Sequence, residues 1–302
     1  MRDPTTQNRV DQILELCDFP PPGSSVTCAV SGGADSLALL VLARRHGLAV
    51  EAVHVDHGLR PGSASEADVV ADACRQFGAG FRAVKVQVGT GPNVEARARE
   101  ARYAALPADV LTGHTADDRA ETVLLNLLRG AGLDGLAGLR PRGGPSGRVR
   151  HPLLALRRTD TENVCADAGL VPVRDPSNDD VGLSRNLVRH QILPALSAAA
   201  GRDLVPILVR QADLMVDDAA ALDDLASQLD PTDARALASA PPALARRAVR
   251  RWLTGTHPPD AATVERVLAV ARGEAVACEL PGGDRVSRRN QRLSRNSPSE
   301  QD

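Results

Sequence analysis

The chain is 302 residues long, which leaves room for one large domain and a smaller one. Its net charge is −2, so a globally basic nucleic-acid-binding surface is excluded, and any site for a polyanion must come from local clusters of arginine. Aromatic residues make up only 2% of the chain, which argues against a generic single-strand binder that stacks bases on aromatic rings.

The cysteines and the apolar runs indicate the compartment in which the protein works. The five cysteines are far apart and form no C-x-x-C pair, which is typical of structural thiols in a reducing compartment. The N-terminal residues are polar, and no apolar run reaches the ~20 residues that span a bilayer. We therefore expect a cytoplasmic protein with no membrane partner.

The first half of the chain alternates short apolar runs with helical patterns. Strands are expected at 26–30, 49–55, 81–88 and 109–113, and helices at 36–46, 65–77, 94–106 and 116–129. This rhythm predicts an α/β fold, a Rossmann-like parallel sheet covered by helices. Ligands of such sheets bind at the carboxyl ends of the strands, so the residues that follow each strand are the first candidates for a site.

The second half is mainly helical. Helices are expected at 157–169, 184–199, 204–229, 235–253 and 261–272, a short strand near 171–173 and a β-hairpin at 275–293. Prolines at 231, 241 and 242 interrupt this stretch, and residues 140–148 form a basic Gly/Pro/Arg loop. We predict a catalytic domain over 1–200, a linker helix over 201–230, a small, mostly helical α+β domain over 231–293 and a disordered tail over 294–302.

The glycine turn at residues 30–36 joins the first expected strand to the first helix. Gly32 and Gly33 allow a sharp turn and a close approach to a ligand, and the helix start presents unpaired N–H groups to an anion. Ser31 and Ser36 add hydroxyls, and Asp35 adds a carboxylate suited to Mg²⁺ or to capping. The turn has neither the lysine of ordinary nucleotide-triphosphatase loops nor the spacing of the dinucleotide fingerprint.

A second signal, residues 113–122, opens the helix after the fourth expected strand. Thr115 and Asp118 have the spacing of an N-cap and its acidic partner. His114 directly precedes them, at the carboxyl end of the expected strand. Acidic residues in a first turn also complement the helix dipole, which is the alternative to a functional role.

Two further residues of this helix, Asp117 and Glu121, share one face with Leu124 and Leu128. We expect them to continue an inward-facing leucine stripe rather than to face solvent. Carboxylates beside His114 would suit an ammonium group or a metal ion. A zinc site is the weaker idea, because no second histidine or cysteine lies near in the sequence.

Several motifs together resemble the tRNA(Ile)-lysidine synthetase family of PP-loop ATP pyrophosphatases. In chain order these are residues 31–36, 55–60, 113–122, 127–138, 175–178 and 185–190, and residues 93–103 also resemble the arginine-bearing helix of the family. The match spans about residues 26–195. At Thr115 the family usually carries a second histidine, which weakens any role for that position.

The resemblance implies that ATP adenylates the C2 oxygen of the wobble cytidine in the isoleucine tRNA with a CAU anticodon. The amine of L-lysine then displaces AMP, and codon reading changes from AUG to AUA. The residues expected to bind ATP are Ser31, Gly32, Gly33, Ala34, Asp35, Ser36, Asp56 and His57. Asp35 is also the expected ligand of Mg²⁺. For His57, a plain polar residue at a strand end is an equal alternative to a role in ATP binding.

The residues expected to act in the chemistry are Asp35, His114, Asp117, Asp118 and Glu121. The acids of the helix would hold the ammonium groups of lysine, and one of them would serve as the base, without a choice among them. His114 would contact the lysine carboxylate or the phosphate, unless it is a satisfied histidine at a helix start.

The cytidine must be splayed out of its stack to reach such a pocket. The residues expected to contact the substrate nucleotide and the tRNA are Arg99, Arg102, Arg129, Arg185, Asn186 and Arg189. The basic run at 246–251 is either a second tRNA contact or a solvated helix face. The oligomeric state stays open, a homodimer included.

The sequence argues against three other functions. A tRNA thiolase of the same loop class needs paired cysteines or an iron–sulfur cluster, which this chain does not offer. An amide-forming synthetase fed by ammonia would need a glutaminase partner or domain. A nucleotide sensor or tRNA-binding module without catalysis would be indicated by decay of the glycine turn or of the acidic cluster, and both are intact.

Overall fold

The protein is described here by a computed structural model that covers residues 4–56, 63–87, 94–143, 147–173, 184–255 and 258–297. Its contacts divide it into two compact units, Met1–Asp213 and Leu214–Asp302. The division falls inside helix α10 (Val205–Ser227), which lies within the range expected for a linker helix. Each unit has its own hydrophobic core and is described by itself.

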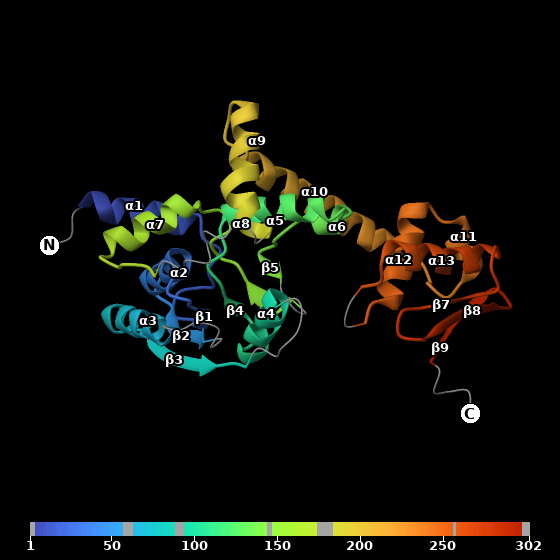
Figure 1. Ribbon diagram of the computed structural model, residues 1–302, viewed down its shortest axis with the longest axis horizontal. Coiled ribbons are helices and arrows are strands. Elements are labelled where there is room, and N and C mark those ends of the chain that lie inside the picture. The colour runs from blue at the N-terminus through green and yellow to red at the C-terminus, as the bar shows by residue number, and fades with distance from the viewer. Residues whose placement is uncertain are drawn as a thin grey trace. The chain divides into compact units, whose positions relative to one another are not determined.

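The first unit is built around one sheet, in which the described residues form the strand order β3-β2-β1-β4-β6-β5 (Figure 1). The strands are β1 (Ser25–Ala29), β2 (Ala49–Asp56), β3 (Gly80–Lys85), β4 (Val110–Leu111), β5 (Arg142–Gly143) and β6 (Val149–Arg150). Neighbouring strands are parallel except β5 and β6. The predicted α/β fold is confirmed.

Helices connect and cover these strands. They are α1 (Pro4–Glu15), α2 (Ala34–Arg45), α3 (Ser63–Phe77), α4 (Val94–Ala105), α5 (Ala116–Leu128), α6 (Leu133–Leu136), α7 (Arg158–Asp167), α8 (Ser184–Leu187), the π-helical turn η3 (Val188–Ile192) and α9 (Leu193–Ala200). Successive residues of β2 point to opposite faces, so Ala52 packs in the cluster of α2 whereas Val53 packs with Tyr103 of α4. The sheet is therefore covered on both faces.

The structure corrects several expected elements of this unit. The segment expected to be a Gly/Pro/Arg loop contains the two-residue strand β5, and the two-residue strand β6 follows it directly. Residues 171–173 form no strand; instead the Val173 N–H donates to the Gly32 carbonyl at 2.9 Å. The helix expected over 184–199 contains the π-helical turn η3, in which one extra residue per turn changes the direction of the side chains that follow.

The second unit packs helices α11 (Ala234–Ser239), α12 (Pro242–Leu253) and α13 (Ala261–Arg272) with an antiparallel sheet. The sheet comprises β7 (Ala277–Glu279), β8 (Arg285–Arg289) and β9 (Arg292–Asn296). The helix expected over 235–253 is divided at Pro241, because proline lacks the N–H that a continuous helix needs. The expected hairpin is a three-stranded sheet that continues to Asn296, so the first residues of the expected disordered tail are ordered.

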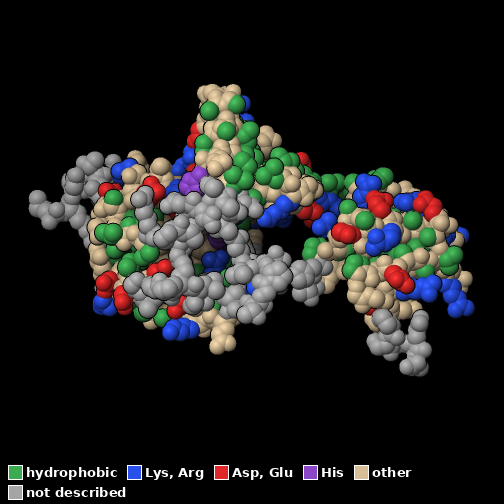
Figure 2. All heavy atoms as spheres, in the orientation of Figure 1, with side chains coloured by type: hydrophobic (Ala, Val, Ile, Leu, Met, Phe, Trp, Pro, Cys, Tyr) green, Lys and Arg blue, Asp and Glu red, His purple; other side chains and the backbone are tan. Residues whose placement is uncertain are grey.

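Apolar surface is present on α9, where Figure 2 shows hydrophobic side chains and Leu196 is 41% exposed. None of the described helices alone is long and apolar enough to cross a bilayer. Only the pair Arg185–Ala200 and Val205–Ser227, bent by 97° at their junction, meets the length and composition requirement when taken together.

Candidate active site

The glycine turn lies between β1 and α2, at the carboxyl end of the central strand. Gly32 has a φ of +89°, a conformation that L side chains rarely adopt, and Gly33 is the N-cap residue of α2. The Ser36 hydroxyl donates to the Gly33 carbonyl at 2.9 Å and accepts the Ser31 N–H at 3.1 Å. These bonds fix the turn so that the first N–H groups of α2 are available to an anion.

A second glycine brings the acidic helix against this turn. A Cβ atom on Gly113, which follows β4, would lie 2.4 Å from the Asp35 carbonyl oxygen and 3.0 Å from the Ser36 nitrogen. No side chain fits at these distances, because the neighbouring atoms belong to the backbone. The β4–α5 loop and the first turn of α2 are therefore in direct backbone contact, so the glycine turn and α5 lie at the same edge of the sheet.

Asp35 stands at the entrance to α2 and is largely enclosed, with 28% of its side chain exposed. Thr161 of α7 donates its hydroxyl to one carboxylate oxygen, and the Arg158 Nε lies 3.7 Å from the other. Burial raises the pKa of Asp35 from its ordinary value of 3.8 to about 6. Because burial disfavours the ionised carboxylate of Asp35, a cation bound beside it would stabilise the ionised form.

The cap predicted at the start of α5 is confirmed. The Thr115 N–H donates to Asp118 Oδ2 at 2.9 Å, and its hydroxyl donates to the same oxygen at 3.1 Å. Burial alone would raise the pKa of Asp118, but the charge of Arg158 and the Thr115 N–H help to hold it below its ordinary value. Only Oδ1 of Asp118 is thus turned toward the rest of the site.

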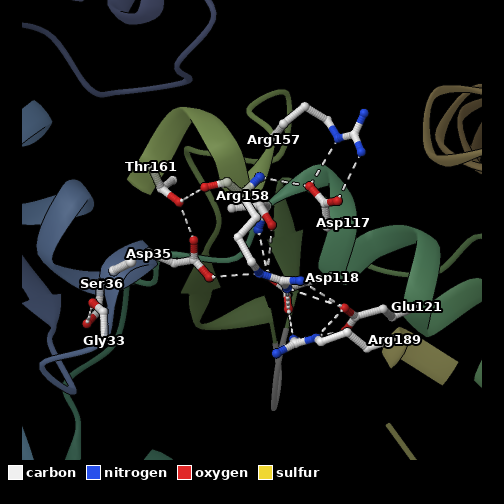
Figure 3. Close-up of polar contacts among 12 residues, drawn as sticks. Gly33, Asp35, Ser36, Asp117, Asp118, Glu121, Arg157, Arg158, Thr161 and Arg189 are labelled. Carbon is white, nitrogen blue, oxygen red and sulfur yellow. Dashed lines mark hydrogen bonds and ion pairs between the residues drawn. The ribbon is translucent and has the colours of Figure 1, made fainter. Parts of the chain in front are cut away.

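Glu121, one turn further along α5, is a fully buried carboxylate surrounded by arginines (Figure 3). Arg189 of η3 binds both of its oxygens, at 2.7 and 3.1 Å. Arg158 approaches Oε1 at 3.3 Å, and Arg185 lies 3.9 Å from Oε2. The expected position of Glu121 inside the fold is correct, but Leu128 of the same predicted stripe is 66% exposed, because α5 turns its last residues toward solvent.

Asp117 has a different environment from the other two acids. Its two oxygens accept the Nε and Nη2 of Arg157, both at 3.1 Å, and Oδ2 also accepts the Arg158 backbone N–H at 2.8 Å. A further nitrogen of Arg157 binds Asp203, whose Oδ1 in turn accepts the Val205 N–H of α10. Asp117 therefore joins α5 to α7 directly, and to the start of α10 through Arg157 and Asp203.

His114 belongs to a buried cluster that the sequence did not reveal. Its Nδ1 lies 2.8 Å from the Thr112 hydroxyl, which is also 2.6 Å from Nδ1 of His151, and the two imidazole rings meet edge to face. Burial lowers the pKa of His114 to about 3, so the ring is uncharged at neutral pH. A second histidine is thus present in space although none is near in the sequence.

The remaining expected residues divide into those near this cluster and those elsewhere. Asp56 ends β2 and is buried, and Asn186 of α8 is buried. Arg102 lies over the Tyr103 ring, and its charge contributes to lowering the pKa of His114. Arg129 caps the exposed end of α5. His57 and residues 175–178 lie outside the described residues, as does the side chain of Arg99 on α4.

A magnesium ion fits this site in one way. Mg²⁺ is commonly held by one or two carboxylates together with substrate phosphates and water. Asp35 offers one such carboxylate beside an anion-binding turn, whereas no cluster of three histidine, cysteine or acidic side chains suited to a metal is found in the described part of the chain. The residues fit an ion that arrives with a nucleotide, and not a metal held by the protein alone.

Comparison with known proteins assigns the two units. A family model described as a PP-loop domain matches residues 3–196, and one described as a TilS substrate binding domain matches residues 233–294. A tRNA(Ile)-lysidine synthase from Salinispora tropica is 42% identical over 95% of this chain and 94% of its own length. The chain belongs to the tRNA(Ile)-lysidine synthase family. A relative of the same name from Nocardia farcinica is 44% identical over 78% of this chain and 77% of its own length.

Membership of the tRNA(Ile)-lysidine synthase family makes the chain an ATP-using ligase with a PP-loop domain, as expected. Among solved structures, a U34-tRNA thiolase from Methanococcus maripaludis with a [4Fe-4S] cluster is similar, with a TM-score of 0.52, 17% identity and coverage of 70% of this chain and 79% of that one. This likeness concerns the fold alone.

Burial raises the pKa of Cys28 and of Cys165 to about 12, so both remain thiols at neutral pH and are poor nucleophiles.

Four side chains at this site had no role in the expectations from sequence. Arg157, Arg158 and Thr161, all at the start of α7, bind the acids of the site, and His151 pairs with His114.

The basic run on α12, in the second unit, is partly neutralised, since Arg246 binds Glu265 and Arg247 binds Asp223. Figure 2 likewise shows acidic and basic side chains intermixed on the visible face of the second unit.

Proposed function

We propose that this chain uses ATP to join L-lysine to C2 of the wobble cytidine in the isoleucine tRNA with a CAU anticodon. The C2 oxygen attacks the α-phosphorus of ATP, and the bond between the α- and β-phosphates breaks to release pyrophosphate. A lysine amine then attacks C2, the bond from C2 to the oxygen breaks, and AMP leaves. The amine loses one proton in this step.

The glycine turn would hold the phosphates of ATP. Backbone N–H groups at the start of α2 can neutralise the charge that builds up on the leaving pyrophosphate. Asp35 is the residue that would hold Mg²⁺, which supplies charge neutralisation at the phosphates when it is bound. Asp56, at the end of the neighbouring strand, borders the same edge of the sheet and is assigned to the nucleoside part of ATP.

Asp118 Oδ1 and Glu121 would hold an ammonium group of lysine, and this pair would receive the proton that the attacking amine loses. We assign Asp117 to holding the start of α7 rather than to lysine, because its described contacts are a two-pronged pair with Arg157 and the backbone N–H of Arg158. His114 is uncharged at neutral pH, so we assign it a hydrogen bond to lysine or phosphate rather than an ion pair.

The tRNA would be bound by arginines at this edge and by the second unit. Arg102, Arg129, Arg185, Asn186 and Arg189, with Arg99 on the same helix as Arg102, are the assigned contacts of the first unit. The match of residues 233–294 to a substrate binding domain supports a tRNA contact by the second unit. Phosphate contacts by arginine would make the affinity for tRNA fall with rising salt concentration.

One observation carries this proposal. The guanidinium of Arg158 contacts Asp35 at the glycine turn. At the same time it contacts Asp118 and Glu121, the acids assigned to lysine. The residues assigned to ATP and those assigned to lysine are therefore separated by a single side chain. Such proximity is required if lysine attacks a base that ATP has just activated.

The order of product release tests the proposal. With purified protein, ATP, Mg²⁺ and the CAU-anticodon transcript, we expect pyrophosphate to form in an amount equal to the active enzyme when lysine is absent. Continuous AMP release should require lysine and should not occur with ornithine or arginine, which serve as matched controls. Continuous AMP release without any amino acid would contradict the assignment.

A further inference from the structure

Arg158 occupies the centre of the site, between the glycine turn and the acids of α5 (Figure 3). Its Nε lies 3.7 Å from Asp35 Oδ2, its Nη2 lies 3.4 Å from Asp118 Oδ1, and both Nη atoms lie 3.3 Å from Glu121 Oε1. One positive charge is thus shared among three carboxylates that belong to two different functional positions.

The contacts of Arg158 are long compared with those of its neighbours. Arg189 binds Glu121 at 2.7 and 3.1 Å, which is the geometry of a firm two-pronged ion pair. Arg158 has no contact shorter than 3.3 Å to any of these acids, and 23% of its side chain is exposed. Arg158 is therefore partly exposed and makes only long hydrogen bonds and ion pairs with these acids, which hold it less firmly than the pair of Arg189 with Glu121.

The oxygens that Arg158 covers are those assigned above to lysine. Asp118 has only Oδ1 free of the Thr115 cap, and Arg158 and Arg189 approach this oxygen at 3.4 and 3.5 Å. The same two arginines face Oε1 of Glu121, so a departure of Arg158 removes one of the two cations at these oxygens. An ammonium and a guanidinium compete for the same carboxylate oxygens, because both are cations that donate N–H bonds. While Arg158 stays where it is, a lysine ammonium meets a positive charge already in place.

A nucleotide changes this balance. Its phosphates, bound at the turn beside Asp35, place several negative charges close to the Nε end of Arg158, and arginine binds phosphate in the same two-pronged way as carboxylate. We infer that Arg158 covers the lysine position in the free protein and leaves it for the phosphates when the nucleotide binds. This inference rests on the proposed lysine position.

The consequence is an order of binding. Lysine binds weakly to the free protein and more tightly to the nucleotide complex, and by thermodynamic linkage lysine strengthens nucleotide binding by the same factor. The arrangement keeps lysine from occupying the site before ATP is present. We expect a coupling factor of about tenfold, within the usual range for such effects.

Equilibrium binding of radiolabelled lysine tests this inference without turnover. The dissociation constant is measured for the whole chain with and without saturating α,β-methylene ATP and Mg²⁺, and the affinity for the analogue is measured with and without lysine. We expect the analogue to tighten lysine binding by about tenfold and lysine to tighten analogue binding by the same factor.

Variants separate the role of Arg158 from a general loss of charge. In Arg158→Met, lysine should bind equally well with and without the analogue, and as tightly as it does to the parent nucleotide complex. Arg158→Lys, which keeps a cation at this place, should restore the dependence on nucleotide. The control Arg75→Met, at an exposed arginine on α3 that pairs with Asp72, should keep the full coupling factor.

Three results would overturn the inference. An equal dissociation constant of lysine for the parent protein with and without analogue would show that Arg158 does not exclude lysine. The proposed lysine site would remain. Loss of lysine binding in Arg158→Met under both conditions would show that Arg158 helps to bind lysine instead of excluding it. Absence of lysine binding by the parent protein under both conditions would remove the lysine position itself, and the proposed function with it.

Discussion

At the scale of single residues, partners decide what each carboxylate of the site can do. Asp117 is tied to Arg157 and to the start of α7, whereas Asp118 spends one oxygen on a helix cap and Glu121 is surrounded by three arginines. The spacing in the sequence predicted that all three acids lie together, but it gave no reason to expect different roles for them. The arginine partners come from positions 37 to 71 residues further along the chain, which no local pattern relates to α5.

Asp35 gives the clearest prediction at this scale. Because the folded protein raises the pKa of Asp35 to about 6, it binds this proton more tightly than the unfolded chain, and stability is lost as the pH rises from 3.8 to 6. The free energy of unfolding of Asp35→Asn, relative to the parent, should therefore increase by about 1 kcal/mol between pH 5 and pH 8.

Denaturant unfolding of both proteins without ligands at the two pH values measures this difference. The comparison cancels the titration of groups that do not interact with Asp35, because only position 35 differs. A difference between the two proteins that is the same at pH 5 and pH 8 would contradict the raised pKa.

At the scale of elements, the site depends on how closely two loops approach. The β4–α5 loop passes against the first turn of α2 at Gly113, and the segment after α7 hydrogen-bonds to the Gly32 carbonyl. The buried Arg119 of α5 also pairs with Asp213 of α10 at 2.6 Å. The first turn of α5 is thus held by contacts with α2 and with α10.

Gly113→Ala tests the first of these contacts. The new methyl group would meet the Asp35 carbonyl at 2.4 Å, and since backbone cannot yield as a side chain does, the glycine turn must shift. We expect a loss of about 1–3 kcal/mol in the free energy of unfolding and about tenfold weaker ATP binding, measured by denaturant titration and calorimetry.

The matched control for this change is Gly132→Ala. A Cβ atom there meets nothing within 4 Å, and the φ of −77° suits any residue. This variant should lose about 0.5 kcal/mol, because alanine is a poorer N-cap than glycine, and should bind ATP like the parent. Unchanged ATP binding by Gly113→Ala would mean that the loop contact does not shape the turn.

The elements that carry the site were predictable where the signals are local. The strand, turn and helix around Gly32 and the cap of Thr115 and Asp118 follow from patterns within a few residues, and the structure confirms them. The strands β5 and β6 and the turn η3 were not predicted, because strands of two residues and an extra residue in a helix leave no periodic signal.

At the scale of the whole molecule, the order of motifs along the chain identified the family before any contact was known. The fold and the reaction follow from that order and from the parallel sheet, which brings the ends of β1, β2 and β4 to one edge. The pairing of Arg158 with acids on two other elements depends on the folded arrangement. The sequence therefore predicted the reaction, and the structure adds that Arg158 lies between the residue proposed to bind Mg²⁺ with ATP and the acids proposed to bind lysine.

The transfer of lysine to the first anticodon position tests the central claim most directly. Radiolabelled lysine, ATP and Mg²⁺ are incubated with the whole chain and either the CAU-anticodon transcript or one that differs only by uridine at that position. We predict ATP-dependent label in the first transcript, recovered in the nucleoside of the first anticodon position, and none in the second. Equal labelling of both transcripts, or consumption of ATP without label in either, would contradict it.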